Sequence, residues 1–144
     1  MRISEVLRAK GDQVVTVVPD TSVSELLSVL SQHRIGAVVV SRDGAAVDGI
    51  VSERDIVRAL AERGAGVLAE PVTAIYTADV HIVVPETQTE ELMRIMTDRR
   101  VRHVPVVVDG VLRGIVSIGD VVKNRIVELE SERETLNDYI STAR

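Results

Sequence analysis

Hydrophobic and polar positions along this chain predict short strands alternating with amphipathic helices. In 22–33, Val23, Leu26, Leu27 and Leu30 recur at three- and four-residue spacing, which is typical of a helix with one buried face. Residues 35–40 are apolar without interruption, which favours a strand buried on both faces. The same reasoning predicts strands at 14–18, 47–51, 80–84, 101–108 and 111–116. It also predicts helices at 3–9 and 52–63, one that follows the capping-box spacing Thr87-x-x-Glu90, and one that begins at Ser117.

This order of elements occurs twice. Pro19 matches Pro85, and Asp43-Gly44 matches Asp109-Gly110; the stretch 68–75 parallels the leading helix. Between 49–58 and 114–123, six of ten positions are identical. An internal repeat of this kind predicts two copies of one β-α-β-β-α unit. We therefore expect a mixed α/β (α+β) fold in which two repeats, 1–66 and 67–127, pack through their sheets with pseudo-twofold symmetry and two related clefts.

The end of the chain differs from both repeats. Its apolar residues form a heptad-like stripe that Arg133 interrupts, while acidic residues cover the other faces; the stripe consists of Val122, Ile126, Leu129, Leu136 and Ile140. This predicts a long amphipathic helix, with 128–144 as an extension beyond the second repeat. Such a helix either lies on its own domain or makes a dimer contact, and the pattern fits both.

Composition narrows the function classes. The 144 residues include no cysteine, which excludes disulfides and thiolate metal sites, and only two tyrosines as aromatic residues. The net charge of -5 and the lack of stacking platforms disfavour nucleic-acid binding. No apolar run approaches the roughly 18 residues of a membrane span, and the N-terminus is too polar for a signal peptide. A cytoplasmic protein that does not bind membranes is expected.

Catalysis finds no support in the motifs. The three histidines, His33, His81 and His103, lie on different predicted elements without metal-ligand spacing, so no metal site is expected. Neither a nucleophile elbow nor a phosphate-binding P-loop occurs. We expect that the protein is not an enzyme and has no catalytic cofactor.

The twin stretches 49–55 (GIVSERD) and 114–120 (GIVSIGD) contain the main candidate chemistry. Each predicts a strand end followed by a helix with Ser at its start and Asp three residues later. Ser52 and Asp55 can cap the first amides of that helix, and the same helix N-terminus can receive an anion. Ser117 and Asp120 offer the same two alternatives.

The repeated motifs resemble the tandem cystathionine-β-synthase (CBS) domain pair, or Bateman module. The resemblance covers about 1–127 and rests on 17–21 (VVPDT), 34–40 (RIGAVVV) and GIVSERD in the first half, and on 84–87 (VPET), 102–106 (RHVPV) and GIVSIGD in the second. It implies homodimers of the pair that bind adenosine-containing ligands, most often AMP, ADP or ATP and sometimes S-adenosylmethionine or NAD. It also implies regulation of an attached or partner protein, which the sequence does not identify.

Two unequal clefts follow from this resemblance. The carboxylates of Asp55 and Asp120 suit ribose hydroxyls, while Ser52 and Ser117 with nearby amides suit phosphate. Adenine contacts are implied for Thr16, Ile35, Gly36, Ala37 and Val38 in the first cleft and for Val80, Ile82, His103 and Pro105 in the second. Arg34 and Arg54 are candidate phosphate contacts of the first cleft, as are Arg100, Arg102 and His103 of the second; each arginine is otherwise a solvated surface charge, and His103 a structural histidine.

The sequence therefore predicts a regulatory module that binds adenine nucleotide, with AMP or ATP favoured, and signals to a partner through conformational change. The alternative is an interaction module whose clefts are degenerate and empty, and which acts through its dimer surface. Tyr76 either borders the second cleft or has a packing role.

Overall fold

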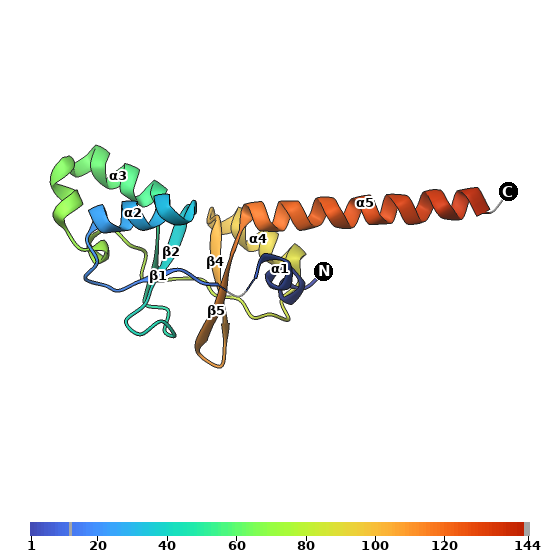
Figure 1. Cartoon of the computed structure of the whole chain (residues 1–144), viewed down its shortest axis with the longest axis horizontal. Coiled ribbons are helices and arrows are strands. Elements are labelled where there is room, and N and C mark those ends of the chain that lie inside the picture. Colours follow the sequence, from blue (N-terminus) through green and yellow to red (C-terminus); the bar gives the residue numbers. More distant parts are fainter. Residues whose placement is uncertain (12, 143–144) are drawn as a thin grey trace.

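The computed structural model describes residues 1–11 and 13–142, and Figure 1 shows the path of the chain. Its α-helices are α1 (Ile3–Lys10), α2 (Val23–His33), α3 (Glu53–Arg63), α4 (Thr89–Arg99) and α5 (Ile118–Thr142). Its strands are β1 (Thr16–Val17), β2 (Ala37–Val40), β3 (Gly49–Ser52), β4 (His103–Val108) and β5 (Val111–Ser117). Two 3₁₀ turns, η1 (Ala65–Ala69) and η2 (Val72–Ala74), stand where the sequence places the counterpart of α1. The predicted pair of α/β repeats with a C-terminal helix is confirmed.

Each repeat has its own small sheet. In the first, β2 lies between β1, which runs parallel to it, and β3, which runs antiparallel. In the second, β4 and β5 form an antiparallel pair with a register irregularity between Val106 and Val107. All four residues of β2 are buried, as their unbroken apolar run predicts.

The predicted strand at 80–84 is wrong for the described structure, where only Val83 bridges to Val106. Val83 donates its amide to the Pro105 carbonyl at 3.0 Å, and the Val107 amide donates to the Val83 carbonyl at 2.9 Å. The next step of a parallel ladder would need an amide from residue 105, and proline has none. Val39 is the matching residue of the first repeat, and there β1 forms.

The predicted side-chain caps also differ between the repeats: the cap of α2 forms and that of α4 does not. Ser22 caps α2, because its hydroxyl accepts the amide of Glu25 at 3.1 Å. Thr87 does not cap α4, which begins after Gln88 without a side-chain cap. The Thr87 hydroxyl instead accepts the amide of Val84 at 3.3 Å, within the turn that precedes the helix.

The short segments that lead into the two repeats are exchanged. Ile3 and Val6 of α1 are completely buried in the core of the second repeat, with Leu92, Val104 and Val116. The turns η1 and η2 instead contribute Val72, Leu68 and Ile75 to the core of the first repeat. The docking is equivalent at both ends: the Ile3 amide donates to the Thr87 carbonyl at 2.9 Å, and the Val72 amide to the Thr21 carbonyl at 2.8 Å. In Figure 1, α1 accordingly lies beside α4 and α5 rather than beside α2.

The glycine that opens each twin motif lies directly under an exchanged segment. The ring of Tyr76 covers Gly49, and a Cβ built on that glycine would collide with it. Leu7 covers Gly114 in the same way, with its Cδ2 2.6 Å from a Cβ built there. The packing role considered for Tyr76 is therefore present, in the core of the first repeat.

Helix α5 starts in the second repeat and projects far beyond it (Figure 1). Val121 is its buried anchor, whereas the heptad-like stripe from Val122 to Ile140 is exposed. Among the described residues, no helix has the length and apolar character that crossing a membrane requires.

Candidate functional site

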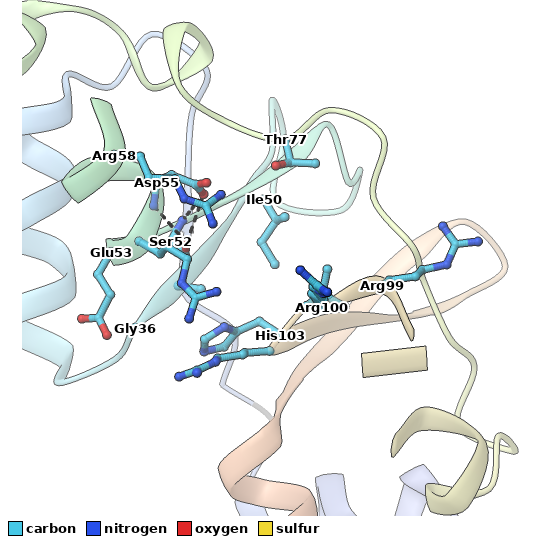
Figure 2. A pocket seen from close by; sticks show the side chains of 14 residues that line it. Gly36, Ile50, Ser52, Glu53, Asp55, Arg58, Thr77, Arg99, Arg100 and His103 are labelled. Atoms are coloured by element: carbon cyan, nitrogen blue, oxygen red, sulfur yellow. Dashed lines mark hydrogen bonds between the residues drawn. The ribbon is translucent and has the colours of Figure 1, made fainter. Parts of the chain in front are cut away.

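Ser52 and Asp55 form a reciprocal capping box at the start of α3. The Ser52 hydroxyl accepts the Asp55 amide at 3.4 Å, and Asp55 Oδ2 accepts the Ser52 amide at 2.8 Å (Figure 2). Ser117 and Asp120 repeat this at α5, with distances of 3.1 and 2.9 Å. Both pairs thus have the structural role that the sequence allows. Within the described residues, Oδ1 of Asp55 accepts no hydrogen bond from the protein, so it remains available to a ligand.

A cavity of about 310 Å³ lies between the two repeats, beside Asp55. One wall comes from the first repeat and includes Gly36, Ala37, Ser52, Arg54 and Asp55. The opposite wall comes from the second repeat, and Figure 2 shows Arg100 and His103 there, across the cavity from Ser52 and Asp55, whereas the Arg99 side chain extends away from these two residues. The sequence grouped Arg100, Arg102 and His103 with the second cleft, but the structure places all three on this cavity.

Positive charge dominates the lining. Five arginines and two carboxylates contribute to the lining: the arginines are Arg54, Arg58, Arg99, Arg100 and Arg102, and the carboxylates are Glu53 and Asp55. In the parts of the chain that the structure describes, none of these five guanidinium groups forms an ion pair with a carboxylate. Unpaired guanidinium groups around a cavity are suited to bind phosphate through charge-assisted hydrogen bonds.

Several residues of the predicted first cleft lie beside this cavity rather than in it. Arg34 and Ile35 line an adjacent open groove together with Leu27, and Gly36 and Glu53 border both hollows. Val38 is completely buried inside β2, and half-buried Thr16 lies on β1, outside the linings of both hollows.

The predicted second cleft is built differently around Asp120. The ammonium of Lys10, from the end of α1, donates to Asp120 Oδ2 at 2.8 Å and to the Ile115 carbonyl at 2.8 Å. Burial raises the pKa of Asp120, but the hydrogen bonds from Lys10 and from the Ser117 amide outweigh it, so this pKa lies below its usual value. Asp120 is therefore an ionised carboxylate that is already paired with the ammonium of Lys10.

The remaining residues predicted for that cleft surround no described hollow. Ser117, Asp120, Val80, Ile82 and Pro105 line neither of the two hollows above. Pro105 is buried in β4, whereas Ile82 is exposed.

His103 lines the cavity and lies close enough to the Lys10–Asp120 pair to feel both charges. Its pKa is lowered, first by burial and then by the charge of Lys10, although Asp120 and Glu53 oppose the shift. A neutral imidazole at neutral pH can donate or accept a hydrogen bond without adding charge to the cavity.

Sequence reasoning missed Arg58, Thr77 and Lys10. Arg58 follows Arg54 by four residues, so the helical period of 52–63 was the signal that places both on one face of α3. Thr77 reaches the cavity because it forms an isolated antiparallel β-bridge with Ile50, a pairing that no local sequence pattern predicts. Lys10 meets Asp120 only because α1 is exchanged into the second repeat. No cluster of three or more potential metal ligands occurs among the described residues.

Two α/β repeats with twin Ser–Asp caps and a cavity rich in arginine between them define a tandem-repeat protein. The CBS domain family model matches 3–62 and 72–126, and the chain belongs to this family. A mitochondrial CBS domain-containing protein of Arabidopsis thaliana is 36% identical over 96% of this chain and 71% of its own length. Neither this relative's name nor the matching family indicates catalysis.

Solved structures agree with the assignment. A CBS-domain protein from Agrobacterium tumefaciens is 46% identical, with a TM-score of 0.84 over 87% of this chain and 99% of its own. A CBS domain protein from Pyrobaculum aerophilum, solved in complex with AMP, is 31% identical, with a TM-score of 0.78 over 90% of this chain and 97% of its own.

Proposed function

We propose that this protein is a regulatory module that binds an adenosine-containing ligand in the cavity between its repeats. The observation that carries the proposal is the opposition of Asp55 to Arg100 and Arg102 on the facing wall: within the described residues, Asp55 Oδ1 accepts no hydrogen bond and the two arginines form no ion pair. Asp55 accepts hydrogen bonds from the ribose hydroxyls, and the arginines bind phosphate. That a similar protein was solved with AMP supports this ligand class.

The charge of the cavity favours ligands with more than one phosphate. The five arginines outnumber the two carboxylates of the lining by three, which exceeds what a single phosphate, with a charge of about -2, can neutralise. We therefore expect ATP or ADP to bind more tightly than AMP. NAD, whose two phosphates carry less charge, is expected to rank below ATP.

Signalling follows from the position of the ligand between two bodies. A nucleotide held by Asp55 on one wall and by Arg100 on the other joins the repeats, and it stabilises the arrangement in which both walls reach it. A ligand changes conformation only through its differential affinity for two arrangements. The regulated partner would recognise the arrangement that the nucleotide favours. A cytoplasmic location stays a prediction from sequence.

Calorimetry with AMP, ADP, ATP and NAD tests this proposal. Asp55→Asn keeps an oxygen for the Ser52 amide and loses the charge, so the fold should survive while affinity falls about tenfold or more. Asp20→Asn, on an exposed turn, is the matched control and should bind like wild type. No heat from wild type with any of the four nucleotides would overturn the proposal.

A second candidate role is interaction through a dimer surface, which the exposed apolar residues favour. Leu27 and Val57 on the first repeat have counterparts in Met93 and Val122 on the second, and all four side chains are exposed. Because α2 packs with α3 and α4 with α5, the two repeats present equivalent apolar patches. A second copy related by a twofold axis can pair both patches at once. The regulatory role and this homodimer are compatible.

Sedimentation tests the homodimer separately. Val57→Glu combined with Val122→Glu should yield monomers, whereas Ser28→Glu, on exposed α2 surface, should leave the oligomer unchanged. Deleting residues 130–144 asks whether the projecting part of α5 contributes. A monomeric wild type would exclude this role without touching nucleotide binding.

A further inference from the structure

Lys10 makes the two clefts chemically different. Its ammonium reaches across from α1 to Asp120 and to the Ile115 carbonyl, over sequence separations of 110 and 105 residues. Two of its three donors are thereby used on the motif that, in the other repeat, faces the basic cavity. The contact is specific to the exchanged packing of α1, since only that packing brings the end of α1 to the start of α5.

In the first repeat, an uncharged backbone amide takes the place that the Lys10 ammonium has in the second. Ile50 is the counterpart of Ile115, and its carbonyl accepts the backbone amide of Thr77 at 2.9 Å. Leu7 and Tyr76 are equivalent residues of the two exchanged segments, because each covers the glycine of a twin motif. With this correspondence, the counterpart of Lys10 in the other segment is Asp79. Among the described residues, no lysine therefore pairs with Asp55, whereas Lys10 pairs with its twin Asp120 at 2.8 Å.

A carboxylate that already has a cation is a poorer acceptor for a neutral diol. Lys10 and the Ser117 amide both use Oδ2 of Asp120, so a ribose would have to approach Oδ1. The adjacent ammonium already neutralises the charge of this carboxylate, which makes it a weaker acceptor for a neutral hydroxyl than the carboxylate of Asp55. The side chains of Lys10 and Asp120 retain 34% and 23% of their exposure, so water reaches the pair and can hydrate both groups when Lys10 swings out.

We propose that Lys10 is the residue that determines specificity in the second cleft: its ammonium occupies the ribose-accepting carboxylate of Asp120, so nucleotide fills the first cleft alone until Lys10 is displaced. This rests on the proposed function, since it assumes that these clefts bind adenosine ligands. It predicts that Lys10 acts as an internal competitor and that removing its charge creates a second binding event.

Calorimetry with ATP and with adenosine on four proteins provides the test: wild type, Asp55→Asn, Lys10→Met and the double variant Asp55→Asn/Lys10→Met. Wild type should bind one ATP per chain, and Lys10→Met should bind two. The double variant should bind about tenfold more tightly than Asp55→Asn alone, through the second cleft. Arg8→Met, also on exposed α1 surface, should match wild type, and Lys10→Arg, which keeps the cation, should still bind one.

Binding of adenosine, which has no phosphate, shows whether Lys10 excludes the ribose or attracts the phosphate. If Lys10 instead recruits phosphate, Lys10→Met will weaken ATP binding and leave adenosine binding unchanged, which overturns the inference. Two equal ATP sites in wild type, or a double variant no better than Asp55→Asn, also overturn it and leave the proposed function standing. No heat from any variant with either ligand would overturn both. Thermal unfolding of each variant confirms that the proteins compared are folded.

Discussion

Arg34 and Arg100 end α2 and α4 in the same left-handed backbone conformation, each with φ of 54°. Their backbones are equivalent, but their side chains face different hollows: Arg100 lines the basic cavity, and Arg34 lines the neighbouring groove. This conformation costs an ordinary residue about 1 kcal/mol, and glycine adopts it freely. The pair therefore offers a way to separate ligand binding from folding.

Arg100→Gly should weaken ATP binding about tenfold without lowering stability, because the lost guanidinium is a phosphate contact and the backbone strain is relieved. Arg34→Gly is the matched control, since it has the same backbone change outside the cavity. Calorimetry and urea unfolding measure the two effects. Equal loss of affinity in both variants would contradict a specific role for Arg100.

The motif glycines should not tolerate even a methyl group. Gly49→Ala and Gly114→Ala place a Cβ against Tyr76 and Leu7, and overpacking of this kind costs about 1–3 kcal/mol. Urea unfolding should show lower midpoints for both. Gly66→Ala, with open space around it, should be neutral or stabilising. Combining Gly49→Ala with Tyr76→Ala should restore part of the loss, and additive losses would argue against the contact.

His103 should make stability fall with acidification. Burial and the charge of Lys10 hold its pKa below 6.5 in the folded protein, whereas in the unfolded chain the imidazole takes up a proton near that value. The stability it contributes is thus present above pH 6.5 and is lost as the pH falls through the folded pKa. Urea unfolding between about pH 5 and 7.5 should show a shallower dependence in His103→Gln.

Affinity should rise with the number of phosphates. We expect ATP to bind more tightly than ADP, ADP more tightly than AMP, and adenosine least, because each phosphate adds charge opposite the five arginines. The differences should shrink as KCl is raised from about 50 to 300 mM, since salt screens the partly solvated arginines. Equal affinities across the series, at any salt, would mean that the arginines do not contact phosphate.

Much of the fold was predictable because its determinants are local. The capping boxes at Ser52 and Ser117 and the apolar faces of α2 and α4 are set by residues three or four apart. The failure of 80–84 to form a strand in the described structure was not predictable locally, because the pairing depends on a proline in a different strand, Pro105. The repeat was recognisable since its two copies keep a nearly constant offset.

The candidate site was less predictable than the fold because it assembles between repeats. Arg100 and His103 belong to the second repeat in sequence, yet they face Asp55 of the first. Nothing within either repeat specifies which wall an exposed side chain will face. Lys10 shows the same limit, since its partner is 110 residues away. Whether these residues bind nucleotide stays a prediction.

The exchange of the leading segments has a consequence for how this chain is synthesised. Helix α1 is synthesised before the residues that bury Ile3 and Val6, which extend to Val121. The first repeat, in turn, lacks Val72 in its core until its connection to the second has emerged. Ile3 and Val6 must therefore stay solvated until the second repeat has been made, and the two repeats complete each other's cores nearly together.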